Sequence, residues 1–133
     1  MRNSENIFHL AIPCKEVNEA QHFYVEKLGC KLARRYADRV TLNFFGNQLV
    51  CHLSPNEIEI SPKMYPRHFG ITFKRKEEFD ALLTRAKEQG IDFFQKPTVR
   101  FAGKLEEHLT FFLKDPSNNL LEFKFYKDSQ MMY

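Results

Sequence analysis

The sequence predicts an α+β fold in which one structural unit occurs twice. Each half of the 133-residue chain has a strand pattern, then a helical pattern ending at a glycine, then a run of short strand-like segments. The two glycines, Gly29 and Gly90, stand at matching places. Because the order of elements repeats, we expect an internal duplication of a unit made of a strand, a helix and a meander of strands. The hydrophobic content of 43%, with fourteen Phe, is ample for the core of one domain of this length.

The first module is expected over residues 6–54. Residues 7–12 are predicted to form a strand that ends at Pro13, and residues 17–28 a helix closed by Gly29. Three strands are then expected, over residues 31–36, 40–45 and 48–53. The pair Gly46-Asn47 is expected to make the turn between the last two.

The second module is expected over residues 68–127, after a linker of residues 55–67 that carries three prolines and has no clear period. Residues 68–73 are predicted to form a strand, and residues 77–89 an amphipathic helix. The remaining strands are expected over residues 91–95, 99–101, 108–113 and 120–126, and Pro97 can join the first two. Residues 101–107 are predicted to form a mobile loop.

Charge and cysteine content exclude several classes of protein. The formal charge of +3 is spread along the chain, which argues against nucleic-acid binding. The sequence shows neither a signal-peptide pattern nor an apolar stretch of the ~20 residues that a membrane helix needs. Three cysteines without a CxxC spacing do not form a disulfide framework. We therefore expect a cytoplasmic protein that binds neither nucleic acid nor membranes.

The last predicted strand carries a carboxylate among apolar residues. The turn residues Asp115–Asn119 lead into it. Alternation places Leu121, Phe123 and Phe125 on a core face, and Leu120, Glu122, Lys124 and Tyr126 on the other. An acid and a base on one face require either solvent or a polar cavity.

Three histidines and this glutamate occupy repeat-related positions. His9 and His68 lie in the first strand of each module, and His52 and Glu122 lie in the last. If those strands are neighbours, all four side chains can point into one cleft. Imidazole and carboxylate are ligands of Zn, Fe, Mn and Ni. The alternative for each residue alone is a satisfied core or surface side chain.

Other polar residues are predicted to contact a substrate near this cleft. Four are assigned this role: Lys124, Tyr126, Arg100 and Thr110. Gly70 either leaves room for substrate or marks a strand bulge. The histidines without a repeat-related position, His22 and His108, are expected to be structural, although His108 can reach the rim of the cleft.

Three phrases of the sequence resemble one known family. They are Phe8–Pro13 (FHLAIP), Phe23–Gly29 (FYVEKLG) and Asp115–Glu122 (DPSNNLLE). They look like the vicinal oxygen chelate superfamily, which includes glyoxalase I, extradiol dioxygenases, and fosfomycin- and bleomycin-resistance proteins. The resemblance spans about residues 7–126.

This resemblance implies two βαβββ modules that make a cup-shaped, incompletely closed barrel around one divalent metal ion, in a homodimer. It implies that His9, His68 and Glu122 match the two histidines and one glutamate of dioxygenase-like members. His52 stands where glyoxalase I carries a glutamate. Asn118 replaces the usual glycine and tolerates the left-handed conformation.

The resemblance also implies a metal-dependent enzyme that chelates two adjacent oxygens of a small substrate. Two reactions remain open, a glyoxalase-like isomerisation or lysis and an extradiol-type dioxygenation with O₂. Glu122 is the only carboxylate of the set available as a base, and His52 takes that role if it does not bind the metal. The alternatives are a ligand-sequestering protein of the bleomycin-resistance type and a dimerisation domain with a vestigial site.

Overall fold

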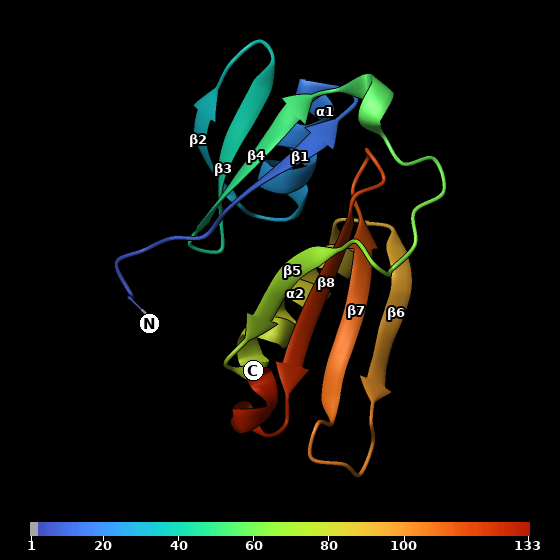
Figure 1. Ribbon diagram of the computed structural model, residues 1–133. Coiled ribbons are helices and arrows are strands. Elements are labelled where there is room, and N and C mark those ends of the chain that lie inside the picture. Colours follow the sequence, from blue (N-terminus) through green and yellow to red (C-terminus); the bar gives the residue numbers. More distant parts are fainter. Residues whose placement is uncertain (1–2) are drawn as a thin grey trace. The chain divides into compact units, whose positions relative to one another are not determined.

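The computed structural model describes residues 3–133 and confirms the duplicated βαβββ order (Figure 1). These residues form two compact units. The first unit consists of the chain up to Ile60 together with Pro116–Asn118, and the second of Ser61–Asp115 together with Asn119–Tyr133. Each unit carries one mixed sheet of four strands and is described separately.

The first unit contains a sheet in the order β1-β4-β3-β2. β1 is parallel to β4, and the other pairs are antiparallel, so the first and last strands of the module are neighbours. Its elements are β1 (His9–Cys14), α1 (Val17–Gln21), β2 (Lys31–Arg35), β3 (Arg39–Phe44), β4 (Asn47–Leu53) and the 3₁₀ turn Pro55–Glu57.

The helix of this unit changes type halfway along. It is α-helical only to Gln21 and continues as a π-helical segment over His22–Lys27. The N–H of Leu28 donates to the carbonyl of Phe23, five residues back, at 2.9 Å. The adjacent side chains of Phe23 and Tyr24 are both buried. A wider turn reduces the rotation between consecutive residues, so two neighbouring aromatic rings can enter one core.

The turn between β3 and β4 lies one residue earlier than predicted. Its two central residues are Phe45 and Gly46, both with positive φ, and Asn47 already belongs to β4. Positive φ at both positions is the backbone geometry of a two-residue type I′ hairpin turn, which twists with its strands. The prediction of Gly46-Asn47 was therefore wrong by one position. The side chain of Asn43 compensates by accepting a hydrogen bond from the N–H of Gly46 at 2.8 Å.

The second unit repeats the arrangement, with a sheet in the order β5-β8-β7-β6 and β5 parallel to β8. The rings of Phe79 on α2 and Phe111 on β7 lie 5.1 Å apart, so this helix covers one face of the sheet, behind it in Figure 1. Glu122 points to the other face. The elements are β5 (Phe69–Phe73), α2 (Lys76–Glu88), β6 (Phe93–Arg100), β7 (His108–Lys114), β8 (Leu120–Tyr126) and the 3₁₀ turn Ser129–Met132.

The β7–β8 hairpin confirms the predicted turn chemistry. Asp115 accepts hydrogen bonds from the backbone and side-chain nitrogens of Asn119, each at 2.8 Å. Asn118 has a φ of 63°, the left-handed conformation that the sequence indicated. The resulting register pairs Lys114 with Leu120 and carries on to the far end of both strands.

Two further expectations concern β6 and the loop that follows it. The two predicted strands around Pro97 form a single strand, with register shifts before and after Gln95. In the loop, the carboxylate of Glu107 accepts a hydrogen bond from the N–H of Gly103 at 2.6 Å, which lowers the pKa of Glu107. The mobility of this loop stays a prediction.

Across residues 3–133, no helix has the length and apolar character needed to cross a membrane.

Gly70 permits the close pairing of β5 with β8. A Cβ built on Gly70 would overlap the backbone carbonyl of Glu122, its register partner. We predict that Gly70→Ala lowers the free energy of unfolding by about 3 kcal/mol or more, since backbone cannot move aside as a side chain can. Urea denaturation measures this change.

The matched control is Gly46→Ala, where the added Cβ meets nothing within 4 Å and only the positive φ is unfavourable. We expect that variant to lose about 1 kcal/mol. Equal losses in the two variants would contradict a steric role for Gly70.

Candidate functional site

The site is built around the carboxylate of Glu122, which is only 6% exposed. Glu122 lies in the middle of the sheet, with Gly70 of β5 on one side and Phe112 of β7 on the other. A carboxylate removed from water loses several kcal/mol of solvation unless it is paired and hydrogen-bonded. Its partners therefore determine what this face can do.

Three side chains contact the Glu122 carboxylate. The hydroxyl of Thr110 on β7 donates to Oε1 at 2.8 Å. Nε2 of His68, just before β5, lies 3.0 Å from Oε2. Nζ of Lys124, two residues along β8, lies 3.7 Å from the same oxygen. Both oxygens thus have a polar partner, and Oε2 has two.

The orientation of His68 determines which of its nitrogens carries a proton. Nδ1 contacts the backbone carbonyl of Met64, which can only accept a hydrogen bond, so Nδ1 carries hydrogen. In the neutral ring Nε2 is then a bare acceptor facing the carboxylate of Glu122, and two acceptors at 3.0 Å repel one another. A proton on Nε2 or a shared cation removes that repulsion. The packing of His68 against Phe112, with ring centroids 5.3 Å apart, helps to hold this orientation.

A closed series of side-chain contacts, here called the contact ring, lies on this face of the sheet. From Glu122 it runs through Lys124, whose Nζ lies 5.7 Å from the ring centroid of Tyr126. The ring of Tyr126 lies 4.6 Å from that of His108, which lies 5.9 Å from that of Phe101.

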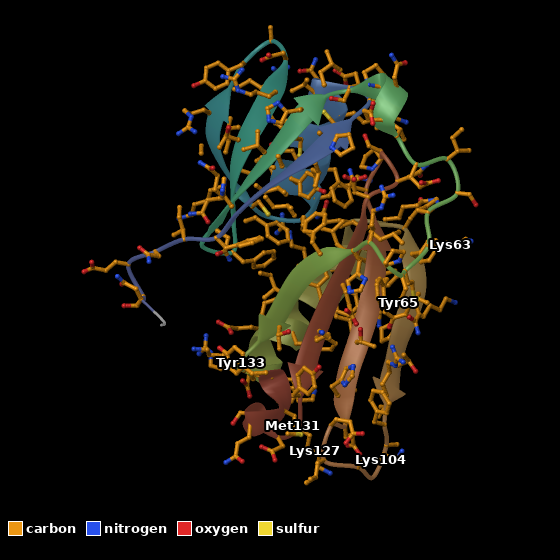
Figure 2. The ribbon with its side chains drawn as sticks, viewed as in Figure 1. Lys63, Tyr65, Lys104, Lys127, Met131 and Tyr133 are labelled. Carbon is orange, nitrogen blue, oxygen red and sulfur yellow. The ribbon has the colours of Figure 1, made fainter. Side chains whose placement is uncertain are left out.

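The contact ring closes through Arg100 and Tyr65. The guanidinium of Arg100 lies 5.3 Å from the ring of Phe101, and its Nη1 donates to the hydroxyl of Tyr65 at 2.6 Å. Tyr65, labelled in Figure 2, precedes β5 and lies edge-on to His68, with centroids 5.6 Å apart. His68 returns the series to Glu122.

The first unit places the other two predicted ligands apart from each other. The β1–β4 register pairs His9 with Gln48, and His52 lies four residues further along β4, opposite Pro13. Four residues of strand span roughly 13 Å, so one ion cannot bind both imidazoles on this face. Gly70, the register partner of Glu122, lies two residues after His68. The residue two positions after His9 is Ala11, and its register partner is Val50. The repeat-related position of Glu122 in the first module is thus Val50 rather than His52.

Across residues 3–133, no three His, Cys, Asp or Glu side chains lie close enough together to hold a metal ion. His68 and Glu122 supply two donors whose geometry fits one. Two neighbouring ligand atoms about 2.1 Å from an octahedrally coordinated ion are about 3.0 Å apart, which is the separation of Nε2 and Oε2.

The structure brings several of the predicted residues of the second unit together, along with residues that were not predicted. Thr110 and Lys124 touch Glu122, and Tyr126 and Arg100 belong to the contact ring. His108, predicted to be structural, is 7% exposed beside Tyr126 and belongs to it too. The sequence contained a signal for the position of His108. Once the turn places Lys114 opposite Leu120, antiparallel pairing places His108, six residues earlier, opposite Tyr126. The contact ring also contains Tyr65 and Phe101, which were not predicted.

The sequence profile of the Glyoxalase/Bleomycin resistance protein/Dioxygenase superfamily matches residues 6–123. The chain therefore belongs to this superfamily, as its motifs indicated. The superfamily contains metal-dependent enzymes.

Solved structures agree with this assignment. The chain is 62% identical to a glyoxalase/bleomycin resistance protein/dioxygenase from Alicyclobacillus acidocaldarius, with all of both chains covered and a TM-score of 0.96. The fosfomycin resistance protein FosX from Listeria monocytogenes is 15% identical, with 96% and 98% of the two chains covered and a TM-score of 0.73. A lactoylglutathione lyase from Agrobacterium tumefaciens is 16% identical, with 93% and 96% covered and a TM-score of 0.67. The last two likenesses show the fold alone.

The hydroxyl of Thr110 is predicted to stabilise the folded protein through Glu122. Thr110→Val keeps the shape of the side chain but leaves Oε1 without its donor, which costs about 1–3 kcal/mol. Urea denaturation at neutral pH measures the change. Thr98→Val, the register partner of Thr110 on β6, is the control and is expected to change stability by less than about 0.5 kcal/mol. Equal effects at the two positions would show that Thr110 does not stabilise the carboxylate.

Proposed function

We propose that this protein is a metal-dependent enzyme that acts on a small oxygenated substrate by chelating two of its adjacent oxygens. The observation that carries the proposal is the pair of His68 Nε2 and Glu122 Oε2, which lie 3.0 Å apart, with Glu122 buried and His68 partly exposed. Such a pair is a ready bidentate site for a divalent cation such as Fe, Zn, Mn or Ni. Membership in a superfamily that contains metal-dependent enzymes supports it.

The residues around Glu122 support distinct roles in such a reaction. When bound, the ion would act as a Lewis acid toward a developing oxyanion. Glu122 is the base that moves a proton in an isomerisation, and Thr110 fixes its orientation through Oε1. Lys124 places a positive charge beside the carboxylate and can stabilise negative charge on substrate. Tyr126 holds Lys124 over its ring face.

Metal content tests the proposal. Protein purified without added metal is expected to contain about one divalent ion per chain by elemental analysis. His68→Ala and Glu122→Ala are expected to lose it, because each removes a donor of the pair. His22→Ala, an exposed histidine on the π-helical segment, is the control and should keep it. A well-folded protein that takes up none of the four metals on dialysis would refute the enzyme and favour a ligand-sequestering protein.

The same measurement assigns the histidines of the first unit. The register lets His9 or His52, but not both, contribute to one ion. We expect His9→Ala to lower metal content and His52→Ala to retain it, because His9 holds the place in β1 that His68 holds ahead of β5. Loss of metal in both variants would be incompatible with the β1–β4 register.

Activity distinguishes the two reactions. Metal-loaded protein is screened with hemithioacetals and with catechols under air, following product formation and oxygen consumption. Turnover without oxygen uptake is expected of an isomerase or lyase, and turnover with uptake of a dioxygenase. In the isomerase, Glu122→Gln should lower kcat at least about 100-fold, since the base is lost. A variant that keeps both its metal and its kcat would remove Glu122 from that role.

A homodimer and a cytoplasmic location stay predictions from the sequence.

A further inference from the structure

Arg100 is a cation of the contact ring without an acidic partner. None of the ion pairs formed within residues 3–133 involves Arg100. Its contacts there are the hydroxyl of Tyr65 and the ring face of Phe101, and neither neutralises its charge. A guanidinium has five N–H donors in a planar fork that fits a carboxylate. Most of these donors remain available.

Tyr65 orients Arg100 and adds a donor of its own. Because the phenol oxygen accepts from Nη1 of Arg100, the phenol proton can be donated to a third group. The ring of Tyr65 also rests edge-on against His68, so the same residue contacts the imidazole next to Glu122. Tyr65 therefore connects the guanidinium of Arg100 to the proposed metal ligand His68, on the same face of the second unit.

The two cations of the contact ring, Lys124 and Arg100, differ in whether an acidic group offsets their charge. Lys124 is already 3.7 Å from the Glu122 carboxylate, which offsets its charge. Arg100 contributes one positive charge that is not offset, bordered by the aromatic rings of Phe101 and Tyr65. A single unmatched guanidinium beside a phenol donor matches a monoanion such as a carboxylate.

We propose that the substrate carries a carboxylate, bound by Arg100 and Tyr65 while its adjacent oxygens lie at His68 and Glu122. The assignment of those oxygens rests on the proposed function. The carboxylate site itself does not, because neither Arg100 nor Tyr65 is a proposed metal ligand. The two ideas can therefore fail separately.

Three probes that differ in the carboxylate test this proposal. They are catechol, 3,4-dihydroxybenzoate and 3-(3,4-dihydroxyphenyl)propanoate, which share the vicinal oxygens. Catechol has no carboxylate, the benzoate carries it directly on the ring, and the propanoate carries it on a two-carbon chain. Calorimetric titrations of the full chain are made with and without Mn²⁺, under nitrogen. At least one carboxylate probe is expected to bind roughly ten- to hundredfold tighter than catechol, as expected for hydrogen bonds to a charged group.

Two variants locate the effect and one serves as control. Arg100→Gln should abolish the preference for the carboxylate probe, and Tyr65→Phe, which removes one exposed hydroxyl, should reduce it severalfold. Arg85→Gln, on α2 at the opposite face of the sheet, should keep it in full. The ratio of the two affinities within one variant does not depend on how well that variant folds.

Each outcome decides between the two ideas. A carboxylate preference that depends on Arg100 but no gain in affinity with Mn²⁺ would support the carboxylate site and count against the metal-dependent enzyme. A gain with Mn²⁺ but no carboxylate preference would overturn the carboxylate site and leave the enzyme standing. A preference that survives Arg100→Gln, or no binding of any probe, would also overturn it.

Discussion

A carboxylate buried in the middle of a sheet is the constraint on which the second unit depends. Glu122 is tolerated there because Thr110, His68 and Lys124 approach its two oxygens from three different positions in the fold. An unpaired charge at this place would cost several kcal/mol, a large part of the total stability of a small domain. The interactions that make the fold possible are thus the ones that orient the carboxylate for chemistry.

These interactions are fixed by strand register, which in turn is fixed by two local features. The turn Asp115–Asn119 sets the antiparallel pairing of β7 with β8 and so places Thr110 and His108. Gly70 lets β5 pair closely in parallel with β8, which brings the preceding His68 to Glu122. A glycine and a turn therefore position the side chains around Glu122.

The sequence was sufficient for what local pattern controls. The order of elements, the two faces of β8 and the left-handed Asn118 follow from periodicity and turn chemistry, and the structure agrees. The register of the parallel pair β1–β4 could not be predicted, because no turn connects those strands directly. That is why His52 was matched with Glu122, where the register gives Val50. Tyr65 was missed because it lies in a segment without any period.

The structure also departs from the sequence prediction where packing overrides propensity. A uniform helix over residues 17–28 would rotate Phe23 and Tyr24 to different directions, and the π-helical segment brings both into the core. In the β3–β4 turn, the strand pairing of Phe44 with Asn47 requires Phe45 to adopt positive φ, which its side chain disfavours. The burial of the two rings favours the first departure, and the hydrogen bond from the N–H of Gly46 to Asn43 favours the second.

The tip of the β7–β8 hairpin belongs to the first unit although its flanking strands belong to the second. There the hydroxyl of Ser117 accepts a hydrogen bond from the N–H of Lys15, and the amide of Asn118 donates to the carbonyl of Glu59. A polypeptide cut between the modules would leave the N-terminal fragment without these three residues.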